Sequence, residues 1–196
     1  MKGLQLGFIG MFVLLSAGCA TVGYSFNYQN RSQLHIGTTT YAQALAFLGT
    51  PRLSNVTDAA SETKILQYMY ATGSLFGATS RVLLLEFRND VLNAYVYNSS
   101  FPGDSTDFPF SSTANIQPGR STRSYVKSLL GEPSGGGVCP CELFARASDL
   151  AGTEVWIWVF TPPTRALARK VIVSKQVVIT FDACGTVARV ESSGGQ

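Results

Sequence analysis

Charged residues and histidine are scarce in this 196-residue chain. Lysine, arginine, aspartate and glutamate together make up only 14% of it, the net charge is +3, and His35 is its single histidine. The chain therefore lacks the dense basic surface that phosphate groups require, which argues against nucleic acid as a partner. A mean hydropathy of +0.15 with so little charge indicates a protein that hides part of its surface against something else.

Catalytic motifs are also missing from the sequence. It contains no Gly-x-Ser-x-Gly, its acidic residues are scattered, and His35 has no matched nucleophile motif. The run Ser134-Gly135-Gly136-Gly137 follows a predicted helix instead of preceding one, so it cannot hold a phosphate at a helix N-terminus. We expect no enzymatic activity, no cofactor and no small-molecule substrate.

Residues 1–18 are typical of a lipoprotein signal peptide. Lys2 precedes an apolar stretch, and Ser16-Ala17-Gly18-Cys19 resembles the lipobox, in which cleavage before Cys19 allows lipid attachment to that cysteine. Ala20 follows where an inner-membrane retention signal would have Asp, which implies the outer membrane and a periplasmic location. An ordinary signal peptide with an incidental cysteine, or a short membrane anchor, is the alternative.

The mature chain would keep a further set of cysteines, Cys139, Cys141 and Cys184, in an oxidising compartment that favours disulfides. A bridge from Cys139 or Cys141 to Cys184 would close a loop of about 44 residues and stabilise the fold by about 4 kcal/mol. A Cys-Pro-Cys bridge would be strained and contribute less, so we favour the long bridge. We expect no metal site, because His35 is too distant in sequence to supply a fourth ligand.

A sequence motif occurs twice, as GTTTYAQALAFLGTP at residues 37–51 and GRSTRSYVKSLLGEP at residues 119–133. Each copy predicts a short amphipathic helix that ends at Leu-Gly-x-Pro. Thr38, Thr39 or Thr40 would cap the first helix, and Ser121 or Thr122 the second. The apolar stripes of the two helices are Tyr41, Ala44, Leu45 and Leu48, and Tyr125, Val126, Leu129 and Leu130.

Similar strand patterns follow both helices. Residues 65–71 and 154–160 alternate with paired aromatic residues, and residues 83–87 and 177–181 alternate before a turn and a last strand. Each copy therefore predicts a helix laid on an antiparallel meander of at least three strands. The expected fold class is α+β, with two tandem helix-plus-meander units arranged as a two-layer α/β sandwich.

These patterns divide the chain into consecutive segments. Residues 98–115 are rich in Ser, Pro, Gly and Asp and predict an ordered connector, with Phe101, Phe108 and Phe110 able to enter a seam between the units. The expected organisation is a signal peptide at 1–18, a tether at 19–34, a first repeat at 35–97, a linker at 98–115 and a second repeat at 116–192.

The repeated motif, followed by an aromatic pair on a strand and a strand ending in Phe, is similar to the SmpA/OmlA family of small outer-membrane lipoproteins. The residues that carry the resemblance are Gly37, Thr39, Leu48, Gly49, Pro51, Tyr68, Tyr70 and Phe87, and Gly119, Ser121, Leu130, Gly131, Pro133, Trp156, Trp158 and Phe181. The resemblance implies a structural or protein-binding subunit of an envelope complex, of the barrel-assembly or secretion type, that contacts lipid head groups.

The tandem arrangement departs from that family, whose known unit is single. It looks more like the β-lactamase-inhibitor protein fold, in which two repeats form a curved sheet that grips a partner. The alternative function is therefore an inhibitor-like or cargo-binding module for a soluble periplasmic protein.

Some side chains are candidates for partner contact. The strand aromatics Tyr68, Tyr70, Trp156 and Trp158 could form hot spots, although strand aromatics are more often core residues. Leu75 and Phe76 lie between glycines at a predicted hairpin tip and could contact a partner or a membrane, or fold back over the sheet edge. The corresponding loop of the second copy carries Arg165, Arg169 and Lys170, which could meet anionic lipid or an acidic partner, or simply be solvated.

Overall fold

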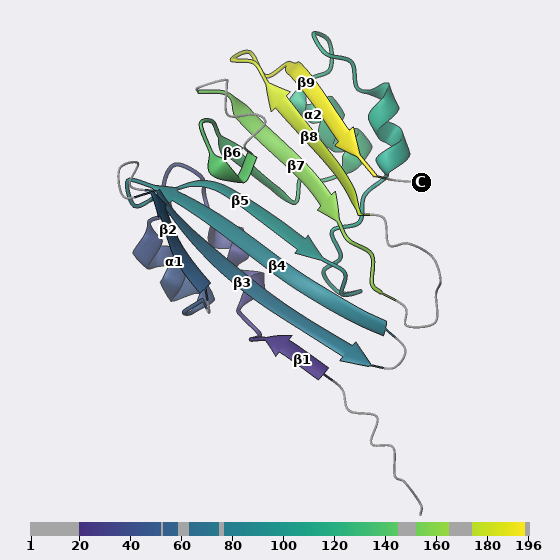
Figure 1. The fold of residues 1–196 in the computed structure, drawn as a ribbon. Helices are drawn as coiled ribbons and strands as arrows, with labels where there is room; N and C mark the ends of the chain where they lie inside the picture. Colours follow the sequence, from purple (N-terminus) through teal and green to yellow (C-terminus); the bar gives the residue numbers. More distant parts are fainter. Residues whose placement is uncertain are drawn as a thin grey trace, which may run out of the picture.

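A computed structural model describes residues 20–51, 53–58, 63–74, 77–144, 152–164 and 174–194. Its main feature is one nine-stranded sheet in which all neighbouring strands are antiparallel (Figure 1). The strands are β1 Ala20–Gly23, β2 Leu53–Asp58, β3 Thr63–Ser74, β4 Gly77–Arg88, β5 Val91–Ser99, β6 Gly135–Val138, β7 Glu154–Phe160, β8 Lys175–Phe181 and β9 Val187–Ser193. Their order is β1-β3-β4-β5-β6-β7-β8-β9, and β2 also pairs with β3.

Helices are few and short in the described part of the chain. The α-helices are α1 Tyr41–Leu48 and α2 Arg123–Leu130, and the 3₁₀ segments are η1 Tyr28–Gln33, η2 Phe110–Asn115 and η3 Glu142–Phe144. None of the helices formed by these residues has the length and apolar character needed to cross a membrane.

The expected fold class, two helix-plus-meander units in a two-layer α/β sandwich, is wrong. The strands form one continuous sheet, because β6 pairs with β5 on one side and with β7 on the other. Each α-helix has only eight residues, about two turns, and is too short to form a second layer over so wide a sheet. The protein is mainly an antiparallel β-sheet to which short helices are added.

Both predicted helices are confirmed, and the structure identifies their caps. The hydroxyl of Thr40 accepts a hydrogen bond from the backbone N–H of Gln43 at 3.3 Å, and Thr122 caps α2 in the same way. Each helix ends at a glycine with positive φ, Gly49 at 86° and Gly131 at 79°. A side chain is strained in that conformation, which explains why glycine recurs at the end of the motif.

The Thr or Ser that precedes each cap ties the helix to its sheet. The hydroxyl of Thr39 accepts from the His35 backbone N–H at 2.8 Å, and the Thr39 carbonyl accepts from Leu92 N–H at 2.8 Å. Ser121 makes the equivalent bonds with Gln117 at 2.9 Å and with Val187 at 2.8 Å. The repeated motif therefore specifies both the helix and the hydrogen bonds that attach its N-terminal end to the sheet.

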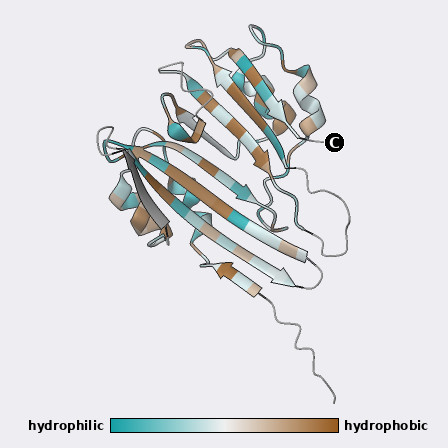
Figure 2. Cartoon of the chain, viewed as in Figure 1, coloured by the Kyte–Doolittle hydropathy of each residue, from teal (hydrophilic) through white to brown (hydrophobic). Residues whose placement is uncertain are grey.

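Two hydrophobic clusters lie between the helices and the sheet. One packs α1 and η1 against β3, β4 and β5, and the other packs α2 and η2 against β7, β8 and β9. Figure 1 shows both α-helices behind the sheet, and Figure 2 shows hydrophobic residues running along β4. Both α-helices thus pack on the same face of the sheet, and neither packs on the other face.

Strand β6 joins the two halves of the sheet through glycines. A Cβ at Gly137 would lie 2.6 Å from the Cβ of Ala94, and a Cβ at Gly135 would collide with the carbonyl oxygen of Tyr95. Larger residues would hold β5 and β6 apart, so the sheet is continuous here because these positions have no side chain. The sequence excluded this run as a phosphate loop but did not predict it as a strand.

Residues 20–34, which belong to the segment 19–34 expected as a tether, are part of the folded structure. Ala20 pairs with Gly73 at the edge of the sheet, and Phe26 and Leu34 are buried in the first hydrophobic cluster. In the connector, Phe108 is buried in the second cluster, and Phe101 stacks on Tyr70 with ring centroids 5.8 Å apart.

Candidate functional site

The sheet has a face that α1 and α2 do not cover. The strand register places one row of residues across this face, because directly paired residues of an antiparallel sheet point to the same side. This row consists of Gln67, Leu84, Val96, Gly135, Ile157, Val178 and Glu191. It is polar at both ends and apolar in the middle.

Apolar side chains on this face stay partly accessible. Met69 is 38% exposed, and its neighbours on the face are half-buried. We define the open face as Met69, Val82, Leu84, Val96, Val159 and Val178. Of the described helices only η3 packs on this side. There Phe144 joins a cluster with Ala94, Val155 and Ile157, and the open-face residues Val96, Val159 and Val178 pack against that cluster.

The two halves of the open face are joined by a polar pair. The side-chain amide of Asn98 donates to the hydroxyl of Thr161 at 2.9 Å, and the Thr161 backbone N–H donates to the Asn98 side-chain oxygen at 3.2 Å. These bonds link β5 to the end of β7, beyond the last residue pair that β6 makes with either strand. The open face is therefore held as one surface.

A groove of about 770 Å³ lies on the opposite, helix-bearing side. Its walls come from η1, from β5, from the connector and from the residues after α2, and they include Tyr28, Arg31, Tyr97, Asp104, Glu132 and Trp158. The groove is thus lined by a mixture of aromatic and charged side chains.

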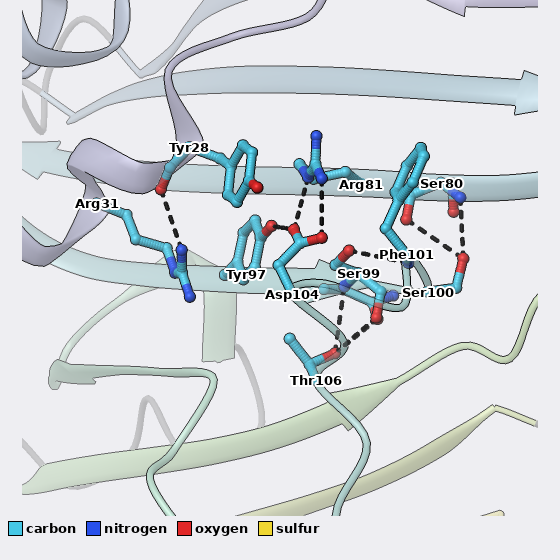
Figure 3. A network of polar contacts seen from close by, with 11 residues as sticks. Tyr28, Arg31, Ser80, Arg81, Tyr97, Ser99, Ser100, Phe101, Asp104 and Thr106 are labelled. Atoms are coloured by element: carbon cyan, nitrogen blue, oxygen red, sulfur yellow. Dashed lines mark hydrogen bonds and ion pairs between the residues drawn. The ribbon is translucent and has the colours of Figure 1, made fainter.

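A polar network beside this groove links Arg81, Tyr97 and Asp104 (Figure 3). Arg81 donates two hydrogen bonds to Asp104, at 2.7 and 2.8 Å, and the Tyr97 phenol donates a further one. The Arg81 guanidinium also lies 3.6 Å from the ring centroid of Tyr28. The network fastens the connector to β4 and β5, so its first role is structural.

Burial and hydrogen bonding have opposite effects on the pKa of the Asp104 carboxylate. Burial alone would raise the pKa of Asp104, but hydrogen bonds from Arg81 and Tyr97 lower it below its usual value. Burial, together with Asp104, raises the pKa of Tyr97. Asp104 is therefore ionised and Tyr97 is neutral near pH 7, as the hydrogen bonds require.

Two of the predicted partner contacts, Tyr68 and Trp158, are core residues. Tyr68 is 3% exposed and Trp158 is 1% exposed, both on the helix-bearing face. The Tyr68 phenol donates to the carbonyl oxygen of Gly49 at 2.7 Å, and the Trp158 indole N–H donates to that of Gly131 at 3.2 Å. Because both side chains are buried, they are not available for partner contact. Their hydrogen bonds hold the C-terminal ends of the two helices.

The other predicted aromatic contacts are half-buried on the same side. Tyr70 stacks on Phe101, whereas the Trp156 indole N–H donates to Glu154 at 2.7 Å and its ring lies 4.7 Å from that of Phe181. The aromatic pairs thus point away from the open face. The alternate positions of the same strands, which include Met69 and Val159, face it instead.

The remaining candidates lie outside the described residues. These are the lipidation site Cys19, the hairpin residues Leu75 and Phe76, and the basic residues Arg165, Arg169 and Lys170. Thr164, which precedes the basic segment, pairs with Ala78 through reciprocal backbone hydrogen bonds of 2.9 Å. Thr164 therefore lies beside the start of β4.

The favoured disulfide to Cys184 is not found in this structure. Cys139 and Cys141 are buried with their sulfur atoms 3.5 Å apart, whereas Cys184 is exposed in the turn between β8 and β9, and all three are free thiols. Burial, reinforced by the neighbouring Cys139, raises the pKa of the Cys141 thiol. Within the described ranges, no group of three or more His, Cys, Asp or Glu residues is placed to hold a metal ion.

Comparison with known proteins gives a distant structural likeness. No protein-family model matches the chain, and no curated protein matches its sequence. Among solved structures, the chain is similar to a "putative beta-lactamase inhibitor protein" from Streptococcus mutans, at 14% sequence identity and a TM-score of 0.46, over 85% of this chain and 94% of that chain.

The resemblance to the SmpA/OmlA family is thus not supported by any family match. The expected likeness to β-lactamase-inhibitor proteins is supported only as a distant structural similarity. At this identity and TM-score, the similarity says nothing about the partner or activity of this chain.

Proposed function

We propose that this chain is a non-catalytic protein-binding module of the cell envelope that binds its partner through the open face. The observation that carries the proposal is the one-sided placement of α1 and α2. Both pack on the same face, and the opposite face keeps partly accessible apolar side chains such as Met69 and Leu84. Apolar residues at the centre of a polar rim are the usual arrangement of a protein interface.

A protein partner fits this surface better than a small molecule does. The open face spans both halves of a hydrogen-bonded sheet, so it presents a broad surface of fixed shape. Small ligands require a concavity that encloses most of their surface, whereas proteins bind broad, preorganised surfaces. The chain's low charge content is consistent with a surface that is covered by another protein.

The proposal places the module at the outer membrane through a lipid on Cys19, with the folded part in the periplasm. Ala20, the next residue, begins β1 and pairs with Gly73, one residue before β3 ends. The lipid would therefore attach at the end of the sheet where β3 turns into β4. The strands would point toward the membrane and the open face would be turned sideways to it.

Site-specific photo-crosslinking in intact cells tests the proposed face. A photoreactive residue at Leu84 or Val82 is expected to crosslink a protein, whereas the same residue at Ala42, which is exposed on α1, is not. Equal crosslinking at both positions, or none at Leu84 and Val82, would refute binding through the open face.

A substitution pair tests the same face independently. Leu84→Arg is expected to abolish the crosslinked product formed from position 82, and Ala42→Arg is expected to preserve it. Thermal unfolding of both variants must show that the fold survives. The Cys19→Ala variant then separates the two partner types, since a membrane-bound assembly complex would be lost with the anchor and a soluble periplasmic partner would be kept.

A further inference from the structure

The thiols of Cys139 and Cys141 are in contact. Their sulfur atoms are 3.5 Å apart, and the two residues are 2% and 1% exposed. A disulfide has an S–S length of about 2.05 Å, so the atoms must approach by about 1.5 Å. Only Pro140 separates the two residues, so this approach takes place within one short loop.

Hydrogen bonds fix the loop that carries both thiols. The Asn93 side chain donates to the Pro140 carbonyl oxygen at 3.1 Å, and the Cys139 N–H donates to the Thr153 carbonyl oxygen at 2.9 Å. Beyond Cys141, the Leu143 N–H donates to a carboxylate oxygen of the buried Glu86 at 2.9 Å. Because the loop is fastened before, between and after the thiols, they stay adjacent while the protein is folded.

We propose that Cys139 and Cys141 are a redox site that forms a disulfide within this loop when the protein is exported. The two thiols lose two protons and two electrons as the S–S bond forms. A disulfide oxidant, either a disulfide-carrying envelope protein or a small disulfide such as oxidised glutathione, accepts them and is reduced to two thiols.

Cys184 does not compete for this bond in the folded protein. It is exposed in the turn of Asp182–Thr186, whereas Cys139 and Cys141 are buried in the cluster that includes Phe144 and Val155. Pairing with Cys184 would require one of the buried cysteines to leave that cluster. The bond within the loop requires no such movement.

The burial of the pair predicts when the bond forms and how it resists reduction. A buried thiol is a poor source of the thiolate that attacks a disulfide, and the raised pKa of Cys141 points the same way. Oxidation therefore takes place when the loop opens locally, while Cys139 and Cys141 remain next to each other. Once the fold is complete, a reductant reaches the bond only when the loop opens.

The bond would stabilise the part of this side of the sheet on which η3 packs. Phe144 follows the loop and packs with Ala94, Val155 and Ile157 on the same side of the sheet as the open face. The disulfide would hold η3 over these residues and so set the boundary of the exposed apolar surface. This inference rests on the sulfur geometry and on the proposed export, and does not depend on the proposed partner.

Peptide mass spectrometry tests the proposal. The full chain is exported with its own leader, quenched in acid, unfolded and labelled with iodoacetamide before digestion with trypsin. Cleavage after Lys127 and Arg146 gives one peptide with both Cys139 and Cys141, and cleavage after Lys175 and Arg189 gives another with Cys184.

The first peptide is expected without label and lighter than the dithiol by two hydrogen atoms, and it should take two labels after reduction. The Cys184 peptide is expected to be labelled from the start. A crosslink between the two peptides, or labelling of Cys139 and Cys141 without reduction, would overturn the proposal.

Two variants complete the test. Cys184→Ser is expected to leave the loop disulfide unchanged, and Cys139→Ser is expected to leave Cys141 open to labelling after unfolding. Refolding the reduced chain with oxidised glutathione should regenerate the same unlabelled peptide. If the Cys184→Ser protein instead remains a dithiol under these conditions, the loop does not form the bond.

Discussion

Tyr68 donates its phenol hydrogen to the carbonyl oxygen of Gly49 at 2.7 Å and so joins the centre of β3 to the end of α1. The helix ends at Gly49, whose carbonyl has no partner within the helix. In the other half, Trp158 makes the equivalent bond to Gly131. In each half, an aromatic side chain of the sheet thus donates a hydrogen bond to the carbonyl oxygen of the glycine that ends the helix.

Tyr68→Phe is expected to lower the free energy of unfolding by about 1 kcal/mol, because it leaves the Gly49 carbonyl without its donor while the ring still packs. Urea denaturation measures the change. Tyr125→Phe, at an exposed position on α2, is the matched control and should change the free energy of unfolding little. An equal effect in both variants would mean that the buried hydrogen bond is not what matters.

Gly137→Ala is expected to destabilise the protein by about 3 kcal/mol, because the new methyl group would lie 2.6 Å from the Cβ of Ala94 and force β5 and β6 apart. Thermal or urea unfolding measures the loss. Gly103→Ala is the control, since no atom lies within 4 Å of the Cβ that it adds. If Gly137→Ala were as stable as the control, the close approach of β5 and β6 would not depend on the absence of a side chain at Gly137.

Asp104→Asn is expected to lower the free energy of unfolding by about 3 kcal/mol at neutral pH, because it leaves Arg81 without its buried counter-charge. The contrast is Asp90→Asn, which breaks the more exposed pair with Lys64 and should cost less than about 1 kcal/mol. Urea denaturation of both variants and of the unaltered chain gives the two differences.

The effect of Asp104→Asn should depend on pH. The pKa of Asp104 is lowered in the folded protein, so its carboxylate stabilises the fold above its unfolded pKa, and this contribution is lost as the pH falls through the folded value. The difference in unfolding free energy between the unaltered chain and Asp104→Asn should therefore shrink in acid. A difference that stays constant down to the lowest pH at which the protein folds would contradict the ionised pair.

Cys19→Ala is expected to move the protein from the membrane fraction to the soluble periplasmic fraction, because it removes the only cysteine in the lipobox-like sequence. Fractionation and immunoblotting measure the distribution, and Cys184→Ser is the matched control. Retention of the Cys19→Ala chain in the membrane fraction would show that another segment anchors it.

The sequence predicts the local structure of this protein better than its architecture. Threonine at the cap, apolar residues at helical spacing and a final glycine specify α1 and α2 because they act over a few residues. The continuity of the sheet depends on β6, where glycines allow two distant strands to approach. No hydrophobic alternation marks Gly135–Val138, so the pattern that identifies other strands could not identify this one.

The candidate site was predictable only in part. Alternation shows that β3 and β7 bear apolar groups on both faces, but it does not show which face the helices cover. The pattern therefore leaves the aromatic residues as candidates for either partner contact or the core, and the structure shows that Tyr68 and Trp158 hold the helix ends. The contact between Cys139 and Cys141 likewise depends on how the Pro140 loop is fastened to β5, which spacing alone does not reveal.

Strand β1 determines how the sheet would respond to mechanical load. A lipid on Cys19 would pull on Ala20 along the axis of β1, which is hydrogen-bonded to β3 from Ala20 to Gly23. Tension along a strand axis loads its hydrogen bonds together, in shear, whereas tension across the strand would break them one after another. The same pairing that completes the edge of the sheet would thus make its N-terminus a firm attachment point for a protein held between a membrane and a partner.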